Sequence, residues 1–380
     1  MTRLLRPAAL VILLAAAAPH AQEMRFHYPA PPESSFSVIK DVTFGTSASG
    51  PLRMDVYRPA SGATHPTLIF FNMATGARRS NPFYASWARI AASKGITAIL
   101  PDLGMESFVQ DFVSLHEYVA RGSGAEHGID KEAVAIYAGS GNAWRALPIV
   151  QDTRTTLVKS AVIYYGAGEV QQFRADLPVL FVRAGLDRPS LNKSMDGIIA
   201  AALSQNAPVR LLNYAAGYHA FEIRNDDEQT RRVIDETIEF VKTTTAPAYQ
   251  EALRRGALEA TAAGHVSGGR FKEAVETYAQ IVKTQPENAT LRLAYGEALL
   301  GHRQFAEACA EFEKLKGKGL GYRDLGVPAA RACMQKGDAE AAIAWLQSIP
   351  ERFRPAELQK DPIFATIQDR PEFKALFKER

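Results

Sequence analysis

Short apolar runs alternate with longer amphipathic stretches between residues 36 and 242 of this chain of 380 residues. Short runs bounded by turn residues are typical of buried strands, and the stretches between them have helical periodicity. Strands that alternate with helices in this way build a largely parallel sheet with helices on both faces. We therefore predict a doubly wound α/β domain with a mostly parallel, eight-stranded sheet.

The predicted elements of this domain follow one another closely. The first two strands alternate apolar and polar side chains, which predicts an antiparallel hairpin at one edge of the sheet. The strands are expected at residues 37–44, 53–57, 67–71, 97–100, 134–137, 158–164, 179–182 and 209–213. The helices are expected at residues 84–93, 111–121, 142–152, 191–203 and 228–242.

The pattern changes after residues 243–247 (TTTAP), where the β-branched runs stop. The remainder is rich in Ala, Leu, Glu and Lys, which favour helices. We predict a linker at this point. The chain then divides into an α/β domain at residues 22–246 and an all-α domain at residues 250–380.

The all-α region repeats with a period of 34 residues, as from Phe271 to Phe305. A repeat of this kind is a helix pair that can bury its apolar face only against a neighbouring pair. Its period and residue types resemble the tetratricopeptide repeat, with Pro286 and Asn288 where that family ends a unit. Small or apolar residues recur in the same register at Ala262, Gly296 and Ala330; Ala274, Ala308 and Ala342; Tyr278, Phe312 and Leu346; and Ile281, Leu315 and Ile349.

This resemblance covers three units, from about residue 255 to about residue 350. The later units depart from it, because Ala339 replaces an aromatic residue and Leu320 and Arg354 replace prolines. Residues 361–377 are expected to cap the last apolar face. The resemblance implies a protein or peptide partner, and the alternative is a helical cap that only stabilises the α/β domain.

The first 21 residues have the pattern of an export signal. Arg3 and Arg6 precede an apolar run at residues 8–18, which is too short to span a bilayer. We expect cleavage between Ala18 and Glu23, and no nearby cysteine supports a lipid anchor. A soluble periplasmic or secreted product without membrane insertion is therefore predicted, and the alternative is a buried first helix.

Charge and cysteine content limit the other possibilities. The formal net charge of +3 falls to about +1 without Arg3 and Arg6, so binding to nucleic acid or to an anionic membrane is not expected. Cys309 and Cys333 are the only cysteines. They can form one disulfide, but two thiols do not make a disulfide scaffold, and the sequence does not place their sulfurs.

The segment AGSGN at residues 138–142 carries the sharpest chemical signal, because it directly follows a predicted strand and precedes a predicted helix. In that context a sharp turn lifts a serine hydroxyl out of the sheet at a helix N-terminus, where peptide dipoles favour negative charge. Ser140 is therefore a candidate nucleophile, and the alternative is a helix-capping serine. Asn142 occupies the place of the second glycine in G-x-S-x-G, which leaves distorted or weak catalysis open.

A serine nucleophile requires a base and an acid later in the chain, in the order serine, acid, histidine. Asp187 follows a predicted strand in the segment LFVRAGLD, and His219 follows the last predicted strand in NYAAGYH. His219 is the candidate general base and then general acid, and Asp187 would orient its imidazole. Taken singly, His219 can be an ordinary loop histidine and Asp187 a turn residue. Asp102 is a rival acid, but its place after the fourth strand fits a structural role.

An oxyanion hole needs two backbone N–H donors, one after the nucleophile and one from the loop after the third strand. Gly141 supplies the first. Ala74, or less favourably Met73, supplies the second, and the alternative is an ordinary surface loop. No metal or cofactor is predicted, since the sequence has no dinucleotide or phosphate-binding motif and five other histidines lack metal-ligand spacing. Those histidines are His65, His116, His127, His265 and His302.

Residues 36–242 resemble the α/β-hydrolase superfamily, and within it the dienelactone hydrolase branch. The resemblance rests on residues 101–103 (PDL), 185–187 (GLD) and 219–221 (HAF). Residues 52–59 (LRMDVYRP) are also similar to the openings of secreted bacterial carboxylesterases. The resemblance implies a triad of Ser140, Asp187 and His219. Dienelactone hydrolases proper have a cysteine nucleophile, so the serine favours general ester hydrolysis.

We predict an exported serine hydrolase that cleaves carboxylic esters through an acyl-enzyme. The segment at residues 165–178 is too short for a large helical lid, which predicts an open site and small or medium acyl groups. One alternative is a peptidase of the same fold. Another is a scaffold whose hydrolase domain has lost activity and whose repeats bind a partner.

Overall fold

The computed structural model describes residues 25–48, 50–62, 64–74 and 77–377, so the predicted export signal at residues 1–21 lies outside the described residues. The chain divides into two compact units, one ending at Thr243 and one beginning at Thr244. Among the described helices, none is both long and apolar enough to cross a membrane.

The first unit is built on a single eight-stranded sheet with the strand order β1-β2-β4-β3-β5-β6-β7-β8. β2 is antiparallel to both β1 and β4, and every other pair is parallel. The predicted mostly parallel sheet with an antiparallel edge hairpin is therefore confirmed, and it fits the α/β-hydrolase fold. The strands are β1 (Phe36–Ser47), β2 (Gly50–Pro59), β3 (Thr67–Phe71), β4 (Thr97–Pro101), β5 (Val134–Gly139), β6 (Val158–Tyr164), β7 (Val179–Ala184) and β8 (Val209–Tyr214).

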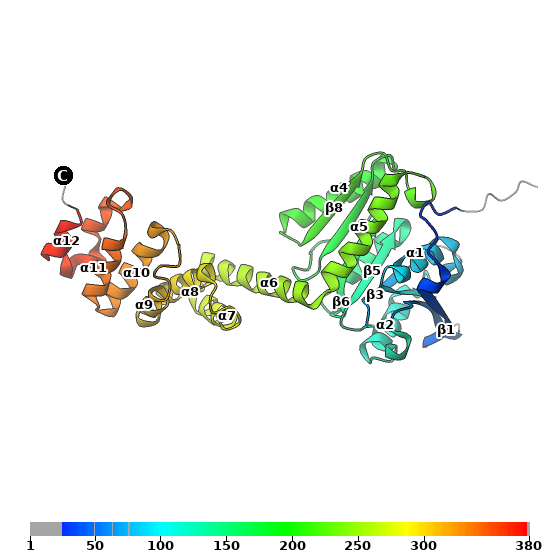
Figure 1. The fold of residues 1–380 in the computed structure, drawn as a ribbon, viewed down its shortest axis with the longest axis horizontal. Coiled ribbons are helices and arrows are strands. Elements are labelled where there is room, and N and C mark those ends of the chain that lie inside the picture. The colour runs from blue at the N-terminus through cyan, green and yellow to red at the C-terminus, as the bar shows by residue number, and fades with distance from the viewer. Residues whose placement is uncertain (1–24, 49, 63, 75–76, 378–380) are drawn as a thin grey trace, which may run out of the picture. The chain divides into compact units, whose positions relative to one another are not determined.

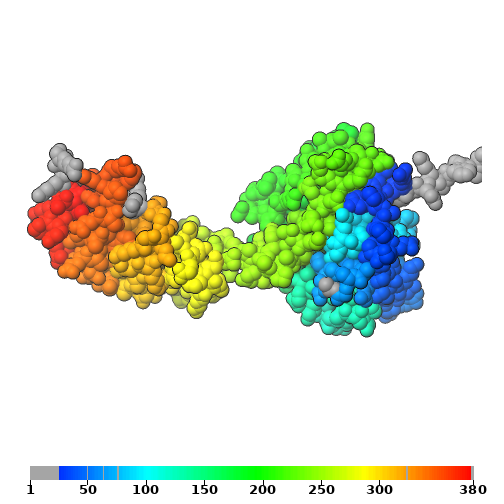
Figure 2. Space-filling model, in the orientation of Figure 1, coloured from blue at the N-terminus to red at the C-terminus, as the bar shows by residue number. Residues whose placement is uncertain are grey.

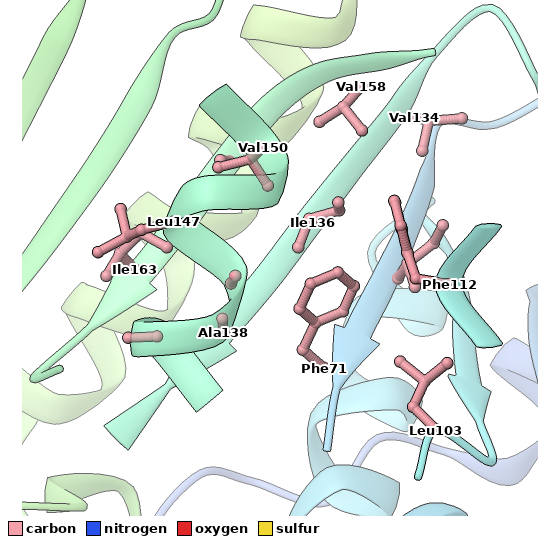
Figure 3. Packing of buried hydrophobic residues seen from close by; sticks show 14 of the residues in the cluster. Phe71, Leu103, Phe112, Val134, Ile136, Ala138, Leu147, Val150, Val158 and Ile163 are labelled. Carbon is pink, nitrogen blue, oxygen red and sulfur yellow. The ribbon is translucent and has the colours of Figure 1, made fainter. Parts of the chain in front are cut away.

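Five helices cover the two faces of this sheet (Figure 1). Side chains of α2, α3 and α4 form one core cluster with the sheet, and those of α1 and α5 form the other. Figure 3 shows Leu147 and Val150 of α3 lying over Ile136 of β5, with Phe112 of α2 beside Phe71 of β3. The helices are α1 (Pro82–Ser93), α2 (Phe108–Ala120), α3 (Ala143–Gln151), α4 (Pro189–Ser204) and α5 (Glu228–Thr245).

The two clusters follow from strand geometry, because successive side chains of a strand point to opposite faces. Ile136 belongs to the cluster under α3, whereas its neighbour Tyr137 belongs to the cluster under α1 and α5. The central strands are buried on both faces, so they appear in the sequence as unbroken apolar runs. β5, for example, is buried at every residue.

The described chain begins with a segment that packs on the outside of the core cluster formed with α1 and α5. The ring of Phe26 packs on the rings of Phe83 and Trp87, with centroid separations of 5.6 and 5.9 Å. The next N–H, from His27, donates to the carbonyl of Glu222 at 2.6 Å. Figure 2 shows this segment in blue on the surface of the first unit. It ties α1 to the loop that follows β8.

From residue 247 to residue 348, the helices of the second unit pack in chain order, each against the next. The sequence predicts a linker before it, but only Ala246 separates the end of α5 from the start of α6. Pro247 takes the first helical position, where a missing N–H costs no hydrogen bond, so the chain needs no loop. The helices are α6 (Pro247–Ser267), α7 (Phe271–Thr284), α8 (Ala289–Gly301), α9 (Phe305–Glu313), α10 (Tyr322–Lys336), α11 (Ala339–Ser348) and α12 (Pro371–Ala375).

The residues that repeat every 34 positions line the interior of the second unit. Ala274, Ala308 and Ala342 are fully buried. A methyl group on Gly296 would lie 2.6 Å from the ring of Phe312, so this position of α8 has room only for glycine. Beyond α11, Phe364 and Phe373 are buried in the same cluster as α10 and α11.

The two cysteines lie in this cluster and are joined. Cys309 of α9 and Cys333 of α10 form a disulfide that closes a separation of 24 residues. Their sulfurs could not be placed from the sequence, because the spacing does not show which helix faces meet. The bond connects two successive helical hairpins of the second unit.

Candidate active site

Ser140 stands at the sharp turn between β5 and α3. Its backbone has a φ of +55°, in the left-handed region that non-glycine residues seldom occupy. Small residues make room for this turn. A methyl group on Gly166, in the loop after β6, would overlap the side chain of Ala143 at the start of α3. This geometry is what the segment at residues 138–142 predicts.

Asp187 and His219 lie on the loops that follow β7 and β8. These loops are held together by backbone hydrogen bonds from Gly185 to the Tyr214 carbonyl at 2.8 Å and from Leu186 to the Gly217 carbonyl at 2.9 Å. Because neighbouring parallel strands end at the same edge of the sheet, their loops deliver both side chains to one place.

The structure brings the three predicted side chains into one chain of hydrogen bonds. Oγ of Ser140 lies 2.8 Å from Nε2 of His219, and Nδ1 of His219 lies 2.6 Å from Oδ2 of Asp187. The Asp187 side chain is 1% exposed, whereas that of His219 is 25% exposed. A buried carboxylate that accepts from Nδ1 leaves Nε2 unprotonated and able to take the serine proton.

Ser140 and His219 open into a cavity of about 190 Å³. Its wall combines aromatic side chains with the nucleophile turn. The lining residues are Asn81, Phe83, Tyr84, Gly139, Ser140, Tyr165, His219, Ala220 and Ile223. The segment at residues 165–178 contains no helix, so no helical lid comes from that loop.

The predicted oxyanion donors are placed less simply. Gly141 follows the nucleophile at the start of the turn into α3, where N–H groups lack partners within the helix. The N–H of Ala74, however, donates to Oδ1 of Asn142 at 2.8 Å. The side chain of Met73 is buried in the core. In this structure Ala74 therefore does not offer its N–H to the cavity, contrary to the sequence prediction.

Asn142 has a role that the sequence did not reveal. Its side chain is buried, and its Nδ2 donates to the hydroxyl of Tyr84 at 2.7 Å while its Oδ1 accepts from Ala74. The amide thus bridges the loop after β3 and helix α1. The sequence signal for this role is that an asparagine stands where the G-x-S-x-G motif has its second glycine.

A second buried network contacts the imidazole of His219 through the ring of Tyr165. The rings of Tyr165 and His219 have centroids 4.8 Å apart. The Tyr165 hydroxyl contacts both carboxylate oxygens of Glu222, at 3.0 and 2.9 Å, and the Trp87 indole donates to Oε1 at 3.3 Å. Burial raises the pKa of Glu222 to about 7. The sequence did not reveal the role of Glu222, because its position three residues after the base does not show that its carboxylate is buried.

The rival acid Asp102 does not contact the imidazole in this structure. Its Oδ2 accepts from Nε of Arg79 at 2.8 Å, and Nη1 of Arg79 also binds Asp55 at 2.8 Å. These contacts fit the structural role expected for Asp102. Among the described residues, no group of three or more His, Cys, Asp and Glu side chains is placed to hold a metal ion.

No protein-family profile matches the chain, and no curated protein matches it. Solved structures similar to part of it include a Pyrobaculum calidifontis esterase, with 17% identity over 55% of this chain and 85% of that chain and a TM-score of 0.46. One of two esterases from Rhizomucor miehei has 14% identity over 57% and 86% of the two chains and a TM-score of 0.47. A bacterial heroin esterase has 14% identity over 56% and 85%, with a TM-score of 0.46.

Proposed function

We propose that this protein is a serine hydrolase that cleaves carboxylic esters of small or medium acyl groups. The observation that carries the proposal is the continuous hydrogen-bonded line from Ser140 through His219 to Asp187, which opens into a cavity. Nucleophile, base and orienting acid are the three parts that acyl transfer by a serine requires.

The reaction follows from these contacts. Oγ of Ser140 attacks the ester carbonyl while Nε2 of His219 takes its proton, and Asp187 offsets the positive charge of the imidazolium. The tetrahedral intermediate collapses, and the leaving alkoxide takes the proton from His219. An acyl-enzyme on Ser140 remains. Water then attacks the acyl carbon, gives its proton to His219, and the acid leaves as the proton returns to Oγ.

The surroundings of the site favour short acyl chains. A cavity of about 190 Å³ is below the usual volume of pockets for drug-sized ligands. Exposed apolar side chains flank the triad in sequence, namely Trp144, Leu186 and Tyr218. Such side chains suit the apolar part of an ester that extends out of the cavity.

We further propose that the enzyme is exported and belongs near the dienelactone hydrolase branch. The residues that resemble that branch, at 101–103, 185–187 and 219–221, support the relationship. The disulfide between Cys309 and Cys333 supports export, because disulfides persist in oxidising compartments.

For the second unit we propose a tetratricopeptide-like array that binds a protein or peptide partner. The burial of Ala274, Ala308 and Ala342 in one register, and the close contact of Gly296 with Phe312, support this proposal. The partner-binding scaffold is a second candidate function that can coexist with the enzyme.

Steady-state hydrolysis of p-nitrophenyl acetate, butyrate, octanoate and palmitate tests the enzymatic proposal, with Ser140→Ala as the background. We expect the acetate and butyrate to turn over fastest and the Ser140→Ala variant to be inactive with all four. If no ester is hydrolysed above that background, the proposal is wrong. If the palmitate is preferred, the assignment of acyl size is wrong.

A further inference from the structure

The side chain of Asn142 has one orientation that satisfies its neighbours. The Ala74 N–H can only donate, so the amide atom 2.8 Å from it must be the oxygen. The amide nitrogen therefore faces Tyr84, 2.7 Å from the phenol oxygen, and donates to it. The hydroxyl of Tyr84 is thus an acceptor in this bond.

This bond leaves the proton of the Tyr84 hydroxyl without an acceptor in the part of the chain that the structure describes. A buried hydroxyl that accepts one bond keeps its own proton for another partner. Tyr84 is only 4% exposed, yet it lines the same cavity as Ser140 and His219. The Tyr84 hydroxyl, which keeps this proton, therefore belongs to the wall of the candidate active site.

The ring is held firmly in this position. Asn81 caps α1 by accepting from the Phe83 N–H at 2.9 Å, which fixes the first turn that carries Tyr84. The ring of Tyr84 packs edge-on against Phe83 at 5.3 Å and against Phe70 at 6.3 Å. A donor fixed in advance costs little reorganisation when charge develops nearby.

We propose that Tyr84 donates the second hydrogen bond to the oxyanion, together with the Gly141 N–H, in place of the N–H of Ala74. The proposal rests on the ester hydrolysis proposed above. The proposal also explains why an asparagine replaces the glycine at position 142. Its Oδ1 accepts from the Ala74 N–H, and its Nδ2 donates to the hydroxyl oxygen of Tyr84.

The electrostatic setting suits a neutral donor. Burial raises the pKa of Tyr84, and the carboxylate of Glu222 raises it further. The phenol therefore keeps its proton across the working pH range.

The test compares Tyr84→Phe with Tyr57→Phe, which removes the hydroxyl of a buried tyrosine in the same core cluster but outside the cavity. With p-nitrophenyl acetate, Tyr84→Phe is expected to lower kcat about 10²- to 10³-fold with little change in KM, as for the loss of one oxyanion donor. Tyr57→Phe should retain the wild-type kcat. Equal kcat in wild type and Tyr84→Phe would overturn the role of Tyr84 alone, whereas a wild type no faster than Ser140→Ala would overturn the proposed function.

Asn142→Gly tests the exchange of donors. It frees the Ala74 N–H, so adding Tyr84→Phe to it should lower kcat far less than in the wild type. An undiminished effect would contradict the replacement of Ala74 by Tyr84.

If Tyr84→Phe does not fold, a fluorinated tyrosine at position 84 keeps the ring and hydroxyl but makes the phenol more acidic. The proposal then expects kcat to change, and an unchanged kcat would overturn it.

Discussion

Oδ2 of Asp187 accepts a hydrogen bond from Nδ1 of His219 at 2.6 Å. The Asp187 side chain is almost completely buried. The other carboxylate oxygen accepts from the N–H of Arg188 at 2.7 Å. Both oxygens are therefore committed to donors, and the carboxylate cannot rotate without losing one of them. The imidazole is consequently fixed with its Nε2 toward Ser140.

Asp187→Asn should lower kcat by about 10⁴-fold, because the amide can donate to Nδ1 and so favour the wrong tautomer. KM for p-nitrophenyl acetate should change little. The matched control is Asp102→Asn, which alters a carboxylate outside the hydrogen-bonded line and should keep kcat near that of the wild type. Equal losses in both variants would contradict the assignment of Asp187 as the acid.

Glu222→Gln should change how stability depends on pH. Burial raises the pKa of Glu222 from 4.5 to about 7, so the unfolded chain releases this proton first as the pH rises. The free energy of unfolding should fall between those two values, by about 3 kcal/mol from this group, and that fall should be absent in Glu222→Gln.

Urea denaturation at low and at mildly alkaline pH measures this difference. Trp345→Phe in every sample removes the indole of the second unit, so that fluorescence reports on the first. Glu228→Gln, at an exposed position of α5, serves as the control and should follow the wild type. Identical pH dependence in Glu222→Gln and the wild type would refute the raised pKa.

Reduction of the Cys309–Cys333 disulfide should destabilise the second unit by about 3 kcal/mol, the chain-entropy value for a closed loop of this length. Thermal unfolding followed by tryptophan fluorescence, in a Trp87→Phe, Trp144→Phe background that leaves only buried Trp345, measures the effect with and without reductant. The double variant Cys309→Ala, Cys333→Ala should not respond to reductant. The intact mass should be lower than that of the reduced chain by two hydrogen atoms, and a mass without that deficit would show that the bond is absent.

Gly296→Ala should destabilise the second unit by about 1–3 kcal/mol, because the added methyl would lie 2.6 Å from Phe312 in a packed core. Gly256→Ala is the matched control. It lies in α6 with no atom within 4 Å of the added methyl, so it should stabilise the helix by about 0.5–1 kcal/mol. Trp345 fluorescence during thermal unfolding, in the same Trp87→Phe, Trp144→Phe background, compares the two. Equal shifts would contradict the close packing of α8 on α9.

The strands and the order of the triad could be predicted from the sequence because both leave local signals. A strand buried on both faces is an unbroken apolar run, and the residue that follows it reaches the carboxyl edge of the sheet. Ser140 and Asp187 each occur just beyond such a run, whereas His219 follows β8, an edge strand that is only partly buried. Their meeting follows from the parallel arrangement of β5, β7 and β8.

The contacts of Asn142 could not be predicted, because they depend on segments far apart in the chain. Ala74 and Tyr84 are 68 and 58 residues away, and nothing in the motif shows where an amide at that position points. The same limit applies to Glu222, since the sequence does not show which carboxylate is buried. Pro247 indicated a break in the helix and so a linker. A proline also suits the first turn of a following helix, however, and only Ala246 lies between α5 and α6.

Intact mass after treatment with a small fluorophosphonate tests the central claim most directly. Only a serine activated by a base should form the adduct, so the wild type should gain one label at Ser140. Ser140→Ala and His219→Ala should gain none over the same time. A folded wild type that remains unlabelled, or a His219→Ala variant labelled as fast as the wild type, would contradict the account.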